Sequence, residues 1–76
     1  MSRPMKRSFQ IRGHRTSLSL EESFWQALRE IAQSEGKTLA GLVGEIDAKR
    51  NAAASGLSGA IRVFILDHYR RKANPD

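Results

Sequence analysis

One short stretch of the chain alternates side chains that can make directed hydrogen bonds with side chains that cannot. The polar residues are Arg15, Ser17 and Ser19, and the alternating apolar or β-branched residues are Thr16, Leu18 and Leu20. A period of two predicts a strand with one buried face and one exposed face. Arg can donate two hydrogen bonds to guanine, and Ser can donate to or accept from several base edges. The exposed face is therefore a candidate contact for nucleic acid, and the alternative is an ordinary solvated face of a sheet.

The net positive charge of the chain lies at the same end as this strand. Residues 1–20 contain five basic residues and no acidic residue, whereas residues 21–76 contain eight of each. Basic arms commonly bind nucleic acid, anionic membranes or acidic proteins. We expect a basic N-terminal arm at 1–12 and a folded domain at 13–72, and the alternative for the arm is a solubilising tail. The phosphate contacts expected from this region are Lys6, Arg7, Arg12 and His14.

Catalysis and metal binding have little support in the sequence. The chain has two histidines and no cysteine, and it lacks a Gly-x-Ser-x-Gly motif, a Gly-rich phosphate loop and a metal-like spacing of His and carboxylates. We therefore expect no enzymatic activity, no small-molecule substrate, no cofactor and no metal. No apolar run approaches the ~20 residues of a membrane span and no signal peptide is visible, so we expect a cytoplasmic protein without a membrane partner.

Three helical patterns follow the strand. Apolar residues that recur on one helix face predict helices at 22–35 and 39–50. A segment that is apolar nearly all round, with Ser58 as its expected N-cap, predicts a third helix at 59–72. Gly36 is typical of a left-handed residue after a helix, and Thr38 is a typical N-cap for the next one. The start of the second helix offers free amides and a positive dipole charge, which can hold a phosphate. Further candidate phosphate contacts are therefore Lys37, Thr38 and Leu39, and the alternative is an ordinary corner between two helices.

The predicted strand has no partner of comparable quality in the sequence. A lone strand leaves its backbone groups unpaired, and a chain of this size often needs a partner subunit to complete its core. We therefore expect the same strand of a second copy to pair with it. Phe9 and Ile11 also alternate, but in the opposite phase, and Gly13 between the two stretches could carry a bulge or bend. Whether residues 9–12 extend the strand or lie in an arm stays open.

Three successive segments carry a family resemblance: the strand RTSLSLEE, the helix SFWQALREIAQSE and the helix start GKTLAGLV. Over residues 15–50 they resemble the ribbon-helix-helix superfamily of MetJ- and Arc-type repressors, and the Gly-x-Thr/Ser-x turn is the most recognisable piece. Over residues 7–71 the segments RSFQIRGHRTSLSLEESFWQALREIA and LSGAIRVFILDHYR are similar to a bacterial subfamily with an additional C-terminal helix.

The resemblance implies a mainly α fold with one N-terminal strand, two helices and a third helix, intertwined as a homodimer. Its two-stranded antiparallel intersubunit ribbon would enter the major groove of double-stranded DNA. The base-reading positions of that family fall on Arg15, Ser17 and Ser19, and its phosphate-holding amides fall on Thr38 and Leu39. The expected function is a dimeric transcriptional regulator, such as a repressor. The alternatives are a protein-interaction module on the same dimeric scaffold and an antitoxin-like repressor of its own operon.

Overall fold

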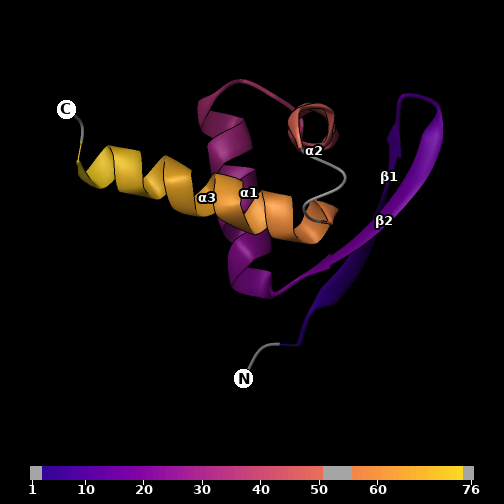
Figure 1. Ribbon diagram of the computed structural model, residues 1–76, viewed down its shortest axis with the longest axis horizontal. Helices are drawn as coiled ribbons and strands as arrows, with labels where there is room; N and C mark the ends of the chain where they lie inside the picture. The colour runs from indigo at the N-terminus through magenta and orange to yellow at the C-terminus, as the bar shows by residue number, and fades with distance from the viewer. Residues whose placement is uncertain (1–2, 51–55, 75–76) are drawn as a thin grey trace.

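Two strands precede three helices in this computed structural model, which describes residues 3–50 and 56–74 (Figure 1). The strands are β1 (Met5–Ile11) and β2 (His14–Leu20), and the helices are α1 (Glu22–Ser34), α2 (Leu39–Lys49) and α3 (Leu57–Ala73). The three predicted helices are confirmed with small shifts at their ends, and so is the additional C-terminal helix. Gly36 has a φ of 68°, the left-handed conformation predicted for the residue that ends α1.

The two strands pair with each other as an antiparallel hairpin within one chain. The register runs from Met5 opposite Leu20 to Ile11 opposite His14, so only Arg12 and Gly13 lie between the strands. Both turn residues have positive φ, 53° and 79°, as the centre of a type I′ turn requires. The prediction of a single N-terminal strand is therefore wrong, because residues 5–11, assigned to the basic arm, form β1. Gly13 closes a tight turn and carries no bulge.

The tight turn also explains why the two strands have opposite phases in the sequence. Phe9 lies opposite Thr16 and Arg7 lies opposite Leu18, so odd-numbered residues of β1 face even-numbered residues of β2. Directly opposed side chains of an antiparallel pair project from the same face. The apolar residues of both strands therefore share one face. Since β2 already has β1 as its partner, the ribbon in this structure lies within one chain, and pairing of β2 does not require a second copy.

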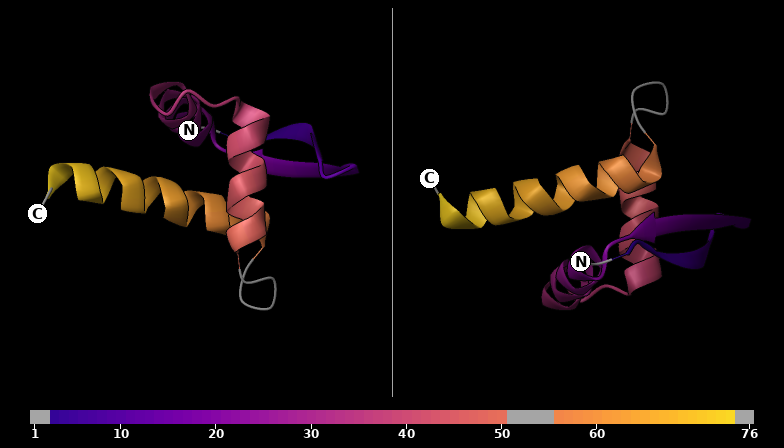
Figure 2. Two further views of the ribbon diagram at one scale, coloured as in Figure 1. Left: turned by 90° about the horizontal axis from the view of Figure 1, so that it is seen from above. Right: turned by 90° about the horizontal axis from the view of Figure 1, so that it is seen from below.

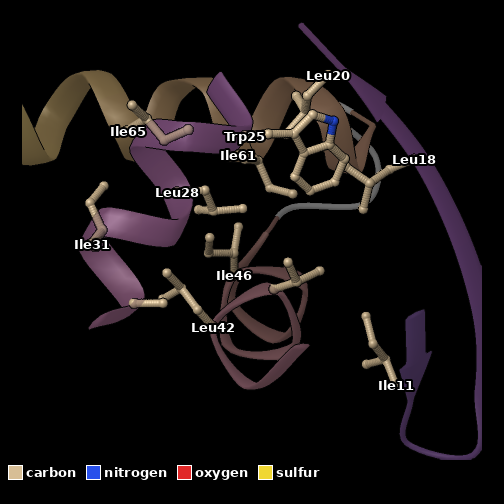
Figure 3. Close-up of a cluster of buried hydrophobic side chains, with 12 residues drawn as sticks. Ile11, Leu18, Leu20, Trp25, Leu28, Ile31, Leu42, Ile46, Ile61 and Ile65 are labelled. Atoms are coloured by element: carbon tan, nitrogen blue, oxygen red, sulfur yellow. The ribbon is translucent and has the colours of Figure 1, made fainter. Parts of the chain in front are cut away.

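Apolar side chains from all five elements meet in one core (Figure 3). Trp25 on α1 is fully buried, and its indole Nε1 donates a hydrogen bond to the Met5 carbonyl over 2.9 Å. The ring centre of Trp25 is 5.9 Å from that of Phe9, so β1 is attached to α1 by both a polar and an aromatic contact. The other buried side chains are Ile11, Leu18, Leu20, Leu28, Ile31, Ala32, Leu42, Val43, Ile46, Ile61 and Ile65.

Helix α3 closes the core with Ile61 and Ile65, both of which are buried. It begins after Gly56, which is its N-cap, and the Oγ of Ser58 donates to the carbonyl of Ser19 over 3.2 Å. The start of α3 is therefore attached to the end of β2. From there α3 and the hairpin extend to opposite sides of α2 (Figure 2). None of the described helices has the length and apolar character needed to cross a membrane.

Candidate nucleic-acid interface

The hairpin face turned away from the core carries only polar side chains, and we call it the outer hairpin face. Its members are Lys6, Ser8 and Gln10 on β1 and Arg15, Ser17 and Ser19 on β2. The register arranges them as three opposed pairs, Lys6 with Ser19, Ser8 with Ser17, and Gln10 with Arg15. All are exposed except Ser19, which is half-buried. The alternation that predicted one exposed strand face is therefore present on both strands.

Three serines of the outer hairpin face, Ser8, Ser17 and Ser19, already take part in hydrogen bonds within the protein. The Oγ atoms of Ser8 and Ser17 are 3.0 Å apart and share a hydrogen bond. Each hydroxyl has one donor and two acceptor sites, so both keep capacity for a further partner. Ser19 lies where β2 meets α3, and its carbonyl is bonded to Ser58. Among the three predicted base contacts, Ser19 is therefore the least accessible.

The four predicted phosphate contacts on the hairpin lie in different places. Lys6 is on the outer hairpin face, whereas Arg7 projects from the opposite face. The guanidinium carbon of Arg7 is 5.3 Å from the ring centre of Trp25, a cation–π contact that holds it against α1. Arg12 and His14 are exposed at the hairpin tip. Lys6 and the turn residue Arg12 thus lie on the outer hairpin face or at its tip, whereas His14, which is opposed to the buried Ile11, projects from the same face as Arg7.

The start of α2 has the geometry predicted for a helix N-terminus. The Oγ1 of Thr38 accepts a hydrogen bond from the Gly41 amide over 3.0 Å, which confirms Thr38 as the N-cap. Leu39 is the first helical residue. The first amides of a helix point out of its N-terminus and carry partial positive charge, so this end can receive an anion.

Lys37, beside that helix start, is engaged by two carboxylates. Its Nζ lies 2.8 Å from an oxygen of Glu45 and 3.0 Å from an oxygen of Glu35. Hydrogen bonds to Glu45 and Glu35 raise the pKa of Lys37, so the side chain stays charged. A phosphate would have to compete with both acids for this ammonium group. Lys37 is therefore a weaker candidate for phosphate contact than its sequence position indicates.

Two members of the outer hairpin face, Ser8 and Gln10, were missed by the sequence analysis. The signal for them was the spacing between the two alternating stretches, which leaves two residues with Gly13 in second place. Such a spacing is typical of a hairpin with a tight turn. Neither strand carries an acidic residue, so the electrostatic field around the hairpin is set by its basic side chains.

Among known proteins, one family model matches the chain, and it is described as a ribbon-helix-helix domain. The match covers residues 4–69 and therefore includes both strands, α1, α2 and most of α3. No curated protein and no solved structure matches the chain. Proteins of the matched family generally bind DNA as dimers and are typically not enzymes.

Proposed function

The chain belongs to the ribbon-helix-helix family, and from this premise we propose that it is a dimeric DNA-binding transcriptional regulator whose outer hairpin face enters the major groove. The observation that carries the proposal is the outer hairpin face itself. It is a two-stranded ribbon with polar side chains on both strands and no acid. A two-stranded ribbon fits the major groove of B-DNA, where each base pair presents a distinct set of donors and acceptors.

Arg15 is the main base-reading residue in this proposal. It is exposed near the hairpin tip, on the outer face, and a bidentate Arg–guanine contact contributes about 1–3 kcal/mol of discrimination. Ser17 discriminates less between bases than Arg15 does, because its hydroxyl can either donate or accept a hydrogen bond. Ser19 contributes at the margin of the contact, since it is half-buried beside α3.

Phosphate contacts in this proposal fix the position of the ribbon on the duplex without reading sequence. The side chains placed to reach the DNA backbone are Lys6 on the outer hairpin face and Arg12 in the turn, whereas His14 is a weaker candidate because it projects from the opposite face. The backbone amides of Thr38 and Leu39 supply a further anion-binding site at the start of α2. Arg7 and Lys37 contribute charge at longer range, because each is already held by partners within the protein.

The dimer in this proposal rests on family membership and not on a strand in need of a partner. Strand β1 already pairs with one edge of β2 inside one chain, and the other edge of β2 has no strand beside it among the described residues. The expected result of light scattering at micromolar concentration, with and without DNA, is a mass of two chains on DNA. A single chain bound at saturation would contradict the dimeric part of the proposal.

A second candidate function, a protein-interaction module, is favoured by apolar side chains on the outside of α3. Val63 and Leu66 are 58% and 56% exposed and lie three positions apart on α3, so they are neighbours on one face of that helix. They belong to the helix that extends away from the hairpin (Figure 2). A chain that acts only as a protein-interaction module would bind no duplex at low salt. DNA binding by the unmodified protein would therefore contradict this candidate as the sole function, although a protein partner at α3 and DNA at the hairpin could still be bound together.

The test of DNA reading compares Arg15→Ala with the matched variant Arg71→Ala. Both remove one positive charge, but Arg71 is exposed near the end of α3. A preferred duplex would be selected from random sequences, and affinities for it and for a scrambled duplex would be measured by fluorescence anisotropy. We expect Arg15→Ala to weaken binding to the preferred duplex by about 5- to 150-fold, which corresponds to the loss of one bidentate contact.

The scrambled duplex separates base reading from charge. Binding to it should fall only a few-fold with either variant, because phosphate attraction does not depend on sequence. Equal losses on both duplexes would make Arg15 a phosphate contact. Failure of the unmodified protein to bind any duplex at low salt would contradict the proposed function.

A further inference from the structure

Strand β1 places a second set of polar side chains beside those of β2 on the outer hairpin face. Gln10 lies directly opposite Arg15, and both are exposed. Directly opposed residues in an antiparallel pair have Cβ atoms about 4.5–5.5 Å apart. Stacked bases along a DNA strand are about 3.4 Å apart, so two side chains at this separation can address neighbouring base pairs.

Among the three opposed pairs, Gln10 and Arg15 form the one in which both side chains end in a planar group with two hydrogen-bonding atoms. Within residues 3–50 and 56–74, neither of them makes a hydrogen bond or an ion pair with another side chain. Ser8 and Ser17, in contrast, are bonded to each other, and Lys6 lies opposite the half-buried Ser19. The pair nearest the turn is therefore the one most available to a ligand.

The two side chains have complementary preferences for bases. The amide oxygen of Gln can accept a hydrogen bond from N6 of adenine while its amide nitrogen donates to N7, and Arg can donate to both O6 and N7 of guanine. A Gln beside an Arg thus fits an adenine beside a guanine. Their backbone positions are set by the register and by the tight turn that follows Gln10 and Ile11.

We propose that Gln10 is a specificity-determining residue, which reads an adenine in the base pair next to the guanine contacted by Arg15. This inference rests on the proposed DNA-binding function. It gives β1 a direct part in sequence reading, so that one chain carries both strands of its reading ribbon. A second copy then adds a second Gln10–Arg15 pair, and the preferred DNA site contains two adenine–guanine steps.

The position of Gln10 is fixed by the core beneath β1, which makes a truncation at this residue informative. β1 is attached to α1 through the Met5 carbonyl and the ring contacts of Trp25. The side chain of Gln10 itself is exposed and projects from the other face. Gln10→Ala should therefore remove a reading group and leave the fold intact, which circular dichroism and the midpoint of urea unfolding will check.

The experiment compares Gln10→Ala with Gln33→Ala, an exposed glutamine on α1. The preferred duplex is first obtained by selection with the unmodified protein. Each position is then changed singly, and 7-deazaadenine, which lacks the N7 acceptor, replaces each adenine in turn. We expect the unmodified protein to lose about 5- to 150-fold in affinity when one adenine next to the essential guanine is changed. Gln10→Ala should lose that preference but keep the preference for guanine, and Gln33→Ala should keep both.

The outcomes distinguish this inference from the proposed function. Sequence-specific binding by the unmodified protein, with the same base preferences in Gln10→Ala, would overturn the reading role of Gln10 and leave the proposed function standing. A uniform loss on all duplexes would overturn it too, because it would make Gln10 a backbone contact. Absence of any DNA binding would overturn both. The salt dependence of binding should be the same for Gln10→Ala and the unmodified protein, since no charge is removed.

Discussion

Replacing Gly13 by Ala tests the tight turn on which the outer hairpin face depends. Gly13 has a φ of 79°, and a Cβ built there meets no atom within 4 Å. The added methyl group therefore causes no clash with neighbouring residues, and its cost comes from the left-handed backbone alone. For an L-residue this cost is about 1–2 kcal/mol. In a domain of this size, 1 kcal/mol lowers the melting temperature by about 4–8 °C.

Gly56→Ala is the matched control for this substitution. Gly56 also has nothing within 4 Å of a built Cβ, but its φ is −75°, so the same chemical change carries no left-handed strain. Ala is a poorer N-cap than Gly but restricts the unfolded chain, and these opposing effects should keep the change within about 1 kcal/mol. Urea unfolding followed by circular dichroism measures both variants. If Gly13→Ala costs no more than Gly56→Ala, the two-residue turn is not formed, and the pairing of β1 with β2 is refuted with it.

Two further substitutions test contacts that support the hairpin. Trp25→Phe removes the indole donor to the Met5 carbonyl and some buried volume, so it should cost about 1–3 kcal/mol in urea unfolding; a loss below about 0.5 kcal/mol would contradict the anchoring role. Circular dichroism is the appropriate readout, since Trp25 is the only tryptophan. The pKa of Glu21 lies below its ordinary value of 4.5 because of a hydrogen bond with its own backbone and one from Arg62. Its contribution to stability is therefore present above pH 4.5 and is lost as the pH falls through the lowered pKa. Glu21→Gln should be less stable than the unmodified protein at pH 7, and the difference should narrow as the pH falls below 4.5; a difference that does not change with pH would contradict the lowered pKa.

The helices could be predicted from the sequence because each has a local signature. Apolar residues recur with helical spacing in α1 and α2, and Thr38 is a hydroxyl residue just before α2. These signals depend on neighbours within a few residues, and the structure confirms Thr38 as a cap through its bond to Gly41. The start of α3 was misplaced because Ser58 has the side chain of a cap, but its hydroxyl is bonded to Ser19 on β2. That contact joins distant segments and has no local signature.

Strand β1 was not predicted because Arg12 is atypical for a tight hairpin turn and Arg7 interrupts the alternation of apolar residues along the strand. Arg12 occupies the first position of the turn, where Asn, Asp or Gly is the usual signal for a type I′ turn. Arg7 lies on the apolar face opposite Leu18, where a polar residue breaks the expected alternation. Its position is explained by the ring of Trp25 on α1, a partner far along the chain. Local periodicity cannot reveal such a contact.

The candidate site was predicted in part. Arg15 and Ser17 are exposed on one strand face, as the alternation indicated, whereas their contact with bases stays a prediction. Gln10 was missed because the strand that carries it was missed. The ion pairs of Lys37 with Glu35 and Glu45 could not be predicted from local sequence patterns either, because Glu45 lies eight positions away on α2.

The core closed by β1 and α3 within one chain bears on how copies of this protein find and leave each other. Buried residues of all five elements pack together within one chain, so the proposed dimer does not need an exchanged strand to complete this core. Association and dissociation of the proposed dimer would then be rigid-body events between folded subunits, with lifetimes set by the packing and charge complementarity of their contact. Mixed pairs could form rapidly by exchange with any related subunit of compatible surface, and mixing two differently labelled samples would reveal that exchange within minutes.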